Sequence, residues 1–402
     1  MSSEPAVLCL NSGSSSLKFA LVRIAQAGEA KLAAGSVEGI GLEQGRLQIR
    51  LRDGEAAVDA ALHIADPADA IERAFDAFAT ARLPAPDAIG HRLVHGGDRY
   101  AGPVRIDDAE LTALRQLSSF APLHMPAELR AIEATRTRYS ALPQVACFDT
   151  TFHQDLPERA RRLPLPARFH EKGIRRYGFH GLSYAYVVET LGSKLGRRSI
   201  IAHLGSGASM VALVDRRPID TTMSFTPAGG LMMGTRTGDI DPGVLLHLLE
   251  GGCDARELQR VFQNESGLLG VSGSTPDMKA LLQRRASDAG AALAVEMFCY
   301  RARAAIGALT ASLGGLETLV FTGGIGEHAS PVRSEICRGL DFLGIELDAS
   351  ANEAAREIIS RAGTPCTVRV VATDEELTIA RETARLLFPA FAGRRQNVRS
   401  LE

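Results

Sequence analysis

The features that this sequence lacks already narrow the classes of protein it can be. Its 402 residues carry a formal net charge of only −2 at pH 7 and contain no basic block. Neither nucleic acid nor an anionic membrane surface is therefore expected as a partner. No apolar run reaches the roughly 18 residues that cross a bilayer, and the start, MSSEPAVLCLN, lacks the pattern of a signal peptide. We therefore expect a cytoplasmic protein of about two or three domains.

Closely spaced cysteines and the two commonest nucleotide-binding signatures are also missing. The six cysteines form no CxxC pair, and they stand at Cys9, Cys147, Cys253, Cys299, Cys337 and Cys366. Buried, reduced thiols are therefore expected rather than a zinc site or disulfides. The sequence has no GxxxxGK[ST] motif, and no GxGxxG follows a strand in a dinucleotide-binding setting.

A polar turn close to the start is the first positive signal. In LCLNSGSSSLKFALV (residues 8–22), two apolar runs flank Asn-Ser-Gly-Ser-Ser-Ser, which predicts two strands joined by a turn. Gly13 lets the backbone approach a ligand, successive N–H groups form an anion-binding concavity, and Lys18 adds positive charge. A solvated hairpin turn explains the same pattern, so this stretch alone leaves both interpretations open.

A second copy of this pattern favours the ligand-binding interpretation. SIIAHLGSGASMVALV (residues 199–214) repeats the apolar run, Gly/Ser turn and apolar run about half a chain length further on. Internal similarity at that spacing indicates a duplicated fold, and two such turns could hold a polyphosphate. A third glycine cluster, LVFTGGIGEH (residues 319–328), predicts a strand-to-helix turn against a nucleotide.

Eight stretches, which together span the chain, resemble those of the acetate kinases and their short-chain acyl kinase relatives. They are NSGSSSLKF (11–19), GHRLVHGG (90–97), FDTTFH (148–153), YGFHG (177–181), HLGSGAS (203–209), FTPAGGLMMGTRTGDIDPG (225–243), GGIGE (323–327) and TDEELTIARET (373–383). The resemblance implies an α/β, duplicated, actin-like (ribonuclease H-like) two-domain fold with a nucleotide-binding cleft between the domains. We expect residues 1–149 with 377–402 to form the N-terminal domain. Residues 150–376 form the C-terminal domain, which makes most of the nucleotide contacts.

The activity that the resemblance implies is reversible, magnesium-dependent transfer of the γ-phosphoryl group of ATP to acetate. The products are acetyl phosphate and ADP, and the reaction belongs to organic acid metabolism and the route to acetyl-CoA. Mg²⁺ is the expected metal, Mn²⁺ is a possible substitute, and the family forms homodimers. Phosphoryl transfer depends mainly on positioning and charge neutralisation, and it needs little covalent help from the protein.

Four residues are candidates for catalysis. Arg92 and Arg236 stand in polar, glycine-rich settings, and the planar fork of arginine suits both a phosphoryl group and a carboxylate. Asp149 follows a predicted buried strand, although a turn or helix-capping carboxylate explains it equally well. His180 is by itself more typical of a structural histidine. By resemblance, Asp149 orients an arginine or the acetate, and His180 donates a hydrogen bond to the transferring phosphoryl group.

The resemblance also assigns the remaining binding residues. Arg92 and an apolar wall of Val94, Leu123, Phe179 and Pro227 bind the acyl group, although each wall residue alone resembles core. Asn11 and Glu375 position the metal, although Glu375 also suits an ordinary helix start. The nucleotide contacts are Ser16, Lys18, His203, Leu204, Gly205, Ser206, Gly207, Asp277, Met278, Lys279, Gly323, Gly324, Ile325, Gly326 and Glu327.

Several positions depart from the usual family pattern. The histidine motif FHGTSH reads FHGLSY here, with Leu182 and Tyr184. The others are Met125 in PLHMP, Ser206 in HLGSG, Lys279 in place of arginine, His328, Asp374, Ala228 and Gly229. None replaces a candidate catalytic residue. Several lie on the expected nucleotide side, where lysine lacks the fork of arginine, so the nucleotide preference stays open.

Three functions remain open at this stage. The first is an acetate kinase, and the second has the same chemistry with propionate or another short-chain acid as the preferred substrate. One methylene group contributes only about 1 kcal/mol or somewhat more to discrimination, so the sequence does not choose between them. The third is an actin-like nucleotide switch, which would not need the four candidate catalytic residues around a small apolar pocket.

Overall fold

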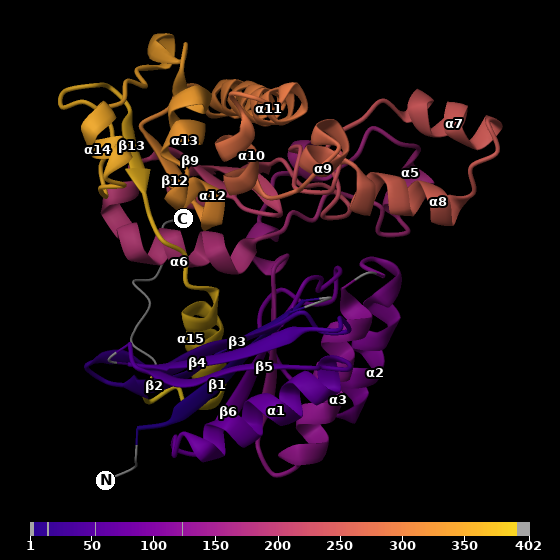
Figure 1. Ribbon diagram of the computed structural model, residues 1–402, viewed down its shortest axis with the longest axis vertical. Coiled ribbons are helices and arrows are strands. Elements are labelled where there is room, and N and C mark those ends of the chain that lie inside the picture. The colour runs from indigo at the N-terminus through magenta and orange to yellow at the C-terminus, as the bar shows by residue number, and fades with distance from the viewer. Residues whose placement is uncertain (1–3, 14–15, 53, 123, 392–402) are drawn as a thin grey trace. The chain divides into compact units, whose positions relative to one another are not determined.

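The computed structural model describes residues 4–13, 16–52, 54–122 and 124–391. The chain divides into two compact units, Met1–Thr151 with Asp374–Glu402 and Phe152–Thr373, which we call the first and the second unit. Each unit contains one β-sheet with helices packed on it (Figure 1). This division is one of compactness, so the expectation that the domains end at residues 149 and 376 stays a prediction.

The first unit is built on an eight-stranded sheet with the order β5-β4-β3-β2-β1-β6-β8-β7. Its strands are β1 (Ala6–Ser12), β2 (Ser16–Ala25), β3 (Gly28–Glu38), β4 (Gly45–Leu51), β5 (Ala56–Leu62), β6 (Ala88–Leu93), β7 (Val104–Arg105) and β8 (Gln144–Phe148). β1 and β2 are the two predicted strands of the opening stretch, and they pair antiparallel from Ala6↔Arg23 to Ser12↔Leu17.

Helices cover both faces of this sheet. They are α1 (Pro67–Thr80), α2 (Asp108–Gln116), α3 (Met125–Arg138) and α15 (Glu375–Leu387), with a 3₁₀ turn η1 (Leu117–Ser119). On one face, Leu8 and Phe19 of the sheet share a buried cluster with Phe75 of α1. On the other face, Gly90 leaves room for α15, because a Cβ there would lie only 2.4 Å from Oγ1 of Thr383.

The second unit has a five-stranded sheet with the order β11-β10-β9-β12-β13. Its strands are β9 (Arg198–Leu204), β10 (Ala208–Val214), β11 (Arg217–Thr221), β12 (Thr318–Thr322) and β13 (Thr367–Val370). Its helices are α4 (Glu158–Arg161), α5 (Ala167–His170), α6 (Gly181–Leu191), α7 (Pro242–Glu250), α8 (Ala255–Arg260), α9 (Gly267–Ser272), α10 (Met278–Arg284), α11 (Ala289–Leu313), α12 (Gly323–His328), α13 (Ser330–Cys337) and α14 (Ala349–Glu353). Shorter turns are η2 (Thr151–His153), η3 (Gly192–Leu195), the π-helical η4 (Val261–Glu265) and η5 (Asp341–Leu343).

The two sheets repeat one topology, which confirms the predicted duplication. In the first, β3, β2 and β1 pair antiparallel, and β6 and β8 then add parallel to β1. In the second, β11, β10 and β9 pair antiparallel, and β12 and β13 add parallel to β9. The two polar turns therefore join equivalent hairpins, β1–β2 and β9–β10, as the sequence similarity indicates.

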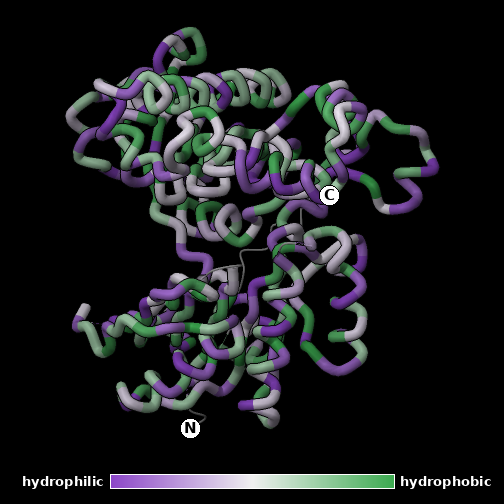
Figure 2. Tube along the Cα trace, turned by 45° about the vertical axis from the view of Figure 1, so that its right-hand side comes forward, coloured by the Kyte–Doolittle hydropathy of each residue, from purple (hydrophilic) through white to green (hydrophobic). Residues whose placement is uncertain are grey.

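The third glycine cluster also has the predicted local structure. β12 is buried along its whole length, and α12 begins directly after it at Gly323. The φ of Gly323 is +76°, a left-handed conformation that glycine adopts without steric cost. Hydrophilic and hydrophobic residues are interspersed along the trace (Figure 2), and among the described residues no helix is long and apolar enough to cross a membrane.

Candidate active site

Arg92 and Asp149 meet at the ends of adjacent parallel strands of the first unit. Arg92 lies in β6, opposite Cys147 of β8, and Asp149 directly follows β8. Asp149 is buried, and its Oδ2 accepts hydrogen bonds from Nη2 of Arg92 at 2.6 Å and from Nε at 3.1 Å. The strand thus delivers the aspartate to a polar site, and the carboxylate holds the guanidinium plane in one orientation.

Two further carboxylates surround the same arginine. Oε1 of Glu128, on α3, lies 3.6 Å from Nη1 of Arg92, and Oε2 of Glu375 lies 4.0 Å from Nε. Burial alone would lower the pKa of Arg92, but Asp149, Glu375 and Glu128 together raise it above its ordinary value. Arg92 therefore stays charged among three acidic side chains, which leaves this group with an excess of negative charge when all three ionise.

The sequence did not single out Glu128. Its carboxylate is 2% exposed, and Oε2 accepts a hydrogen bond from the backbone N–H of Val94 at 3.0 Å. Burial raises the pKa of Glu128 to about 7, against the opposing influence of Arg92. The only local signal for this residue was its position on the apolar face of a helix. A carboxylate is rarely buried there unless another group pairs with it.

Asn11 and Glu375, the predicted metal-positioning pair, lie together in the first unit. Nδ2 of Asn11 donates a 3.0 Å hydrogen bond to Oε2 of Glu375, the first residue of α15. Burial raises the pKa of Glu375, and Arg92 opposes that shift. A magnesium ion bound to nucleotide phosphates keeps several waters and takes only one or two protein carboxylates. The amide and carboxylate of this pair fit such an ion, although the described residues contain no cluster of three or more His, Cys, Asp or Glu around one point.

The other predicted residues of the first unit are only partly described. Ser16 and Lys18 lie in β2, beyond the turn that begins at Gly13, whose N–H donates to the carbonyl oxygen of Ser16 at 2.7 Å. Val94 is 2% exposed and directly follows β6. Leu123 lies outside the described residues.

In the second unit, Gly207 brings His180 and Arg236 together over the second polar turn. A Cβ added to Gly207 would lie 3.3 Å from Nε2 of His180 and 3.7 Å from Nη1 of Arg236. Glycine is thus the residue that leaves this space open to both side chains. An imidazole and a guanidinium that face one small space suit an anion with several oxygens.

Arg236 is held by a tight turn and by a close approach of the backbone. The N–H of Met233 donates to the carbonyl oxygen of Arg236 at 3.1 Å, and Nη1 of Arg236 donates to the carbonyl oxygen of Pro227 at 3.1 Å. Gly267, with φ +62°, packs against this turn, because a Cβ there would lie 2.2 Å from the carbonyl oxygen of Met233. Pro227, a predicted wall residue, is therefore a direct neighbour of Arg236, while Phe179 is buried.

His180 is held in an uncommon conformation at the start of α6. Its φ of 58° and ψ of 25° lie in the left-handed region, which costs free energy for a residue other than glycine. Its ring stacks on that of His203 at 4.2 Å between centroids, and its Nδ1 lies 2.8 Å from Oγ of Ser209. β9 and β10 pair His203 with Ser209, so both contacts come from one position of the sheet.

Two of the three predicted nucleotide segments of the second unit meet at His203. A Cβ on Gly323 would lie 3.1 Å from Nε2 of His203, and one on Gly205 would lie 3.8 Å from the same atom. Oε1 of Glu327 accepts hydrogen bonds from the N–H of Gly323 at 2.9 Å and from that of Thr373 at 3.1 Å. The glycine cluster and the second polar turn are therefore adjacent.

The predicted adenosine-side residues stand at a helix start. Oδ1 of Asp277 accepts the N–H of Ala280 at 2.7 Å and so caps α10, and Lys279 is exposed. Met278 is 4% exposed, so its side chain contributes to the core rather than to a surface.

A buried arginine that the sequence did not single out supports the glycine cluster from behind. Nη1 of Arg333 donates to the carbonyl oxygens of Gly326 and Glu327, both at 2.9 Å, and Nε donates to Oδ1 of Asn352 at 2.7 Å. Arg333 is fully buried, so these carbonyl groups have a charged partner in the protein interior. Its role depends on residues up to 19 positions away, which no local pattern reveals.

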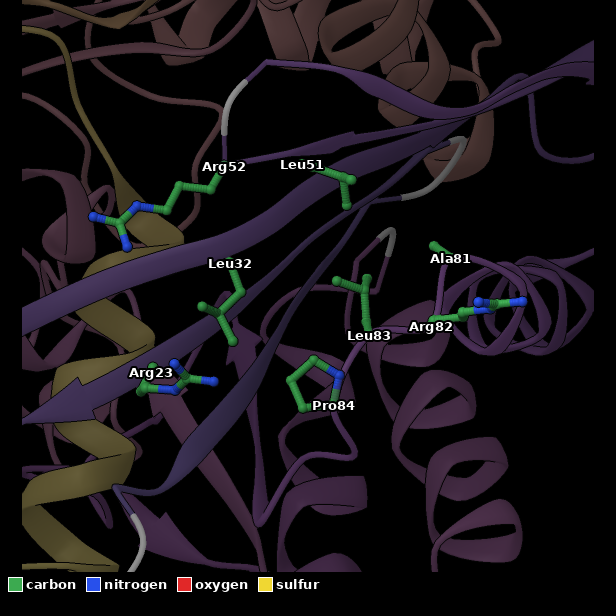
Figure 3. A pocket seen from close by; sticks show the side chains of 8 residues that line it. All are labelled: Arg23, Leu32, Leu51, Arg52, Ala81, Arg82, Leu83 and Pro84. Atoms are coloured by element: carbon green, nitrogen blue, oxygen red, sulfur yellow. The ribbon is translucent and has the colours of Figure 1, made fainter.

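A separate hollow on the first unit contains none of the predicted site residues. Figure 3 shows the eight side chains that line it, which are Arg23, Leu32, Leu51, Arg52, Ala81, Arg82, Leu83 and Pro84. All three arginines are exposed. This hollow therefore plays no part in the chemistry considered below.

Comparison with known proteins identifies relatives over nearly the whole chain. Residues 6–381 match the profile of the Acetokinase family. An acetate kinase of Rhodopseudomonas palustris is 42% identical over 94% of this chain and 98% of its own, and a propionate kinase of Citrobacter rodentium is 40% identical over 94% and 96%. The crystal structure of Porphyromonas gingivalis acetate kinase matches with a TM-score of 0.84 and 38% identity, over 95% of this chain and all of that one.

Proposed function

This chain belongs to the acetokinase family of phosphotransferases, and we propose that it transfers the γ-phosphoryl group of ATP reversibly to acetate. Its duplicated α/β architecture is the actin-like fold of that family. The products in the direction of acetate activation are acetyl phosphate and ADP. The observation that carries the proposal is the pair of cationic and hydrogen-bonding groups, Arg236 and His180, that face one space over Gly207.

The second unit supplies the groups for the phosphoryl chain. In phosphoryl transfer, charge spreads over the equatorial oxygens of the transferring group, and fixed donors stabilise it. Arg236 neutralises that charge, and His180 donates a hydrogen bond to it. The turn from His203 to Gly207 and the cluster from Gly323 to Glu327 bind the nucleotide phosphates, and Asp277 to Lys279 lie beside the nucleoside.

The first unit supplies the groups for the acyl acceptor. Arg92 binds the acetate carboxylate, and Asp149 holds the guanidinium so that its fork faces that anion. Val94 and Leu123 of this unit belong to the proposed apolar wall for the methyl group, to which the resemblance also assigns Phe179 and Pro227 of the second unit. The carboxylate attacks the γ-phosphorus directly in line, so no phosphorylated residue is required, and exclusion of water protects ATP from hydrolysis.

Magnesium is the metal in this proposal. When bound, it would supply positive charge for the nucleotide phosphates. Glu375 and Asn11 position the ion, and Mn²⁺ is an expected substitute. The raised pKa of Glu375 supports this role, because a buried carboxylate gains more than a solvated one from a nearby cation.

Propionate kinase is the second candidate, because relatives with both names match this chain almost equally. The mechanism is then unchanged, and only the fit of the apolar wall to the acyl chain decides which acid is preferred. We also propose a cytoplasmic homodimer.

The decisive experiment traps acyl phosphate with hydroxylamine, with Mg-ATP and acetate, propionate or butyrate in parallel. We expect product with acetate leading, and an Arg236→Ala variant slower by about 10²- to 10³-fold. A faster rate with propionate or butyrate would keep the mechanism and change the preferred acid. No product with any acid, from folded protein that binds ATP, would overturn the proposal in favour of a nucleotide switch.

A further inference from the structure

Tyr184, which replaces the histidine usual in this motif, lies behind His180 and bonds to Ser209, just after the second polar turn. It is fully buried one helical turn after His180 on α6, where its N–H donates to the carbonyl oxygen of His180 at 3.0 Å. Its hydroxyl hydrogen-bonds to Oγ of Ser209, whose Oγ also lies 2.8 Å from Nδ1 of His180. The three side chains therefore form a continuous hydrogen-bonded chain.

The chemistry of the three groups determines the direction of this chain. A hydroxyl group has a single proton and can donate to only one neighbour. A phenol is a stronger acid than an aliphatic alcohol and thus the stronger donor, so Tyr184 donates to Ser209. Ser209 then keeps its own proton for Nδ1 of His180, and this direction of the 2.8 Å contact leaves the imidazole proton on Nε2.

The Nε2 atom is the one that faces the space over Gly207. A proton on Nε2 makes His180 a hydrogen-bond donor at that point, whereas the opposite tautomer would present a lone pair to an anionic phosphoryl group. The tautomer that the chain selects is therefore the one that phosphoryl stabilisation requires.

The other charged and titratable groups around His180 act in the same direction. His203 of β9 stacks on its ring, and Nη1 of Arg236 approaches the same space over Gly207. His153 of η2 packs its ring edge-on against that of Tyr184, and burial lowers the pKa of His153 to about 4, so it is neutral. A positive charge on His180 would face the Arg236 cation, and Ser209 would have to accept a hydrogen bond from Nδ1 instead of donating one.

We infer that Tyr184 and Ser209 are positioning residues that hold His180 neutral, with its proton on Nε2, ready to donate to the transferring phosphoryl group. The inference rests on the proposed function for the identity of the acceptor. It assigns a role to a position at which this chain departs from the family pattern. Tyr184 touches neither substrate in this assignment, because it acts only through Ser209.

The kinetic experiment compares Tyr184→Phe, Ser209→Ala and the double variant with the wild-type chain. Tyr184→Phe should lower kcat by about threefold to tenfold, which corresponds to one hydrogen bond, with KM for ATP and acetate nearly unchanged. The acid limb of the kcat profile should move to higher pH, because the released Ser209 hydroxyl can turn to accept a hydrogen bond from Nδ1–H of an imidazolium, which favours the charged form of His180. Since Tyr184 acts through Ser209, the double variant should be no slower than Ser209→Ala.

Tyr177→Phe is the matched control. Tyr177 is also buried in this unit, and its hydroxyl donates to the carbonyl oxygen of Gly173 at 2.8 Å, away from His180. This variant also loses one buried hydrogen bond, but it should leave the acid limb in place. An equal shift of the acid limb in Tyr177→Phe, or multiplicative losses in the double variant, would overturn the inference.

A spectroscopic measurement tests the same inference without any activity. In protein labelled with ¹⁵N-histidine, the imidazole signals that disappear in His180→Gln belong to His180. Their shifts should report a proton on Nε2 and an acceptor at Nδ1 near neutral pH, and a loss of this single tautomer in Tyr184→Phe. A proton on Nδ1 in the wild-type chain would refute the relay even if the enzyme is active. Failure to form acyl phosphate would instead refute the proposed function and leave the tautomer result standing.

Discussion

Nη2 of Arg92 donates a 2.6 Å hydrogen bond to Oδ2 of Asp149, and this contact joins the ends of two neighbouring parallel strands. Asp149 is 1% exposed, so its carboxylate contacts the arginine in the protein interior and is shielded from solvent. The contact fixes the orientation of the guanidinium plane. In the proposed function, the binding of the substrate carboxylate depends on that orientation.

Arg92→Lys tests that dependence on geometry. Lysine keeps the positive charge but loses the planar fork, so it cannot bind Asp149 and a substrate carboxylate in the same way. We expect kcat to fall by about 10²-fold and KM for the acid to rise, with KM for ATP changed much less. Steady-state kinetics with each substrate varied in turn measures this, and an unchanged KM for the acid would remove Arg92 from the acyl site.

Val94→Ala tests the acyl wall. Removal of two methyl groups from a buried side chain enlarges the space for the acyl chain, so the ratio of kcat/KM for propionate to that for acetate should rise about fivefold or more. The comparison of the two acids within one variant cancels any loss of folded protein. Identical ratios in variant and wild type would show that Val94 belongs to the core alone.

Glu375→Gln tests the metal site. Glutamine keeps the size of the side chain but loses its charge, so the magnesium concentration for half-maximal rate should rise, by about tenfold if one charge-assisted contact is lost. A titration of Mg²⁺ at saturating ATP and acetate measures the change. If the metal dependence is unaltered, Glu375 serves only as a carboxylate at the start of α15, where its charge favours the helix dipole.

Glu128→Gln tests the burial of a carboxyl group beside Arg92. Burial raises the pKa of Glu128 from its ordinary value of 4.5 to about 7 in the folded protein. Between pH 4.5 and pH 7, the folded state therefore keeps a proton on this group that the unfolded state has released. This contribution to the free energy of unfolding is fully present below pH 4.5 and is lost as the pH rises through 7. The loss is on the order of 3 kcal/mol at most.

Glutamine has no such titration, and its side-chain oxygen can still accept the N–H of Val94. Relative to the wild type, Glu128→Gln should therefore gain stability between pH 5 and pH 8, which urea unfolding at both pH values measures. A difference between the two proteins that does not vary with pH would contradict the raised pKa.

The local pattern of the sequence determined the elements and their turns. The apolar runs around residues 11–16 and 205–207 form paired strands, and GGIGE begins a helix after a buried strand. Asp107 accepts the N–H of Glu110 at 2.8 Å and caps the start of α2. These features depend on backbone conformation and on hydrogen bonds between near neighbours, so residue type and spacing suffice to predict them.

The assembly of the side chains was decided only by the tertiary structure. Asn11 and Glu375 are 364 positions apart, and they meet because α15 packs against β1 in the sheet of the first unit. Glu128 acquires its raised pKa, and Tyr184 its place behind His180, from burial and from partners on other elements. Desolvation and hydrogen-bond direction depend on which atoms surround a group in three dimensions, and the order of residues along the chain does not contain that information.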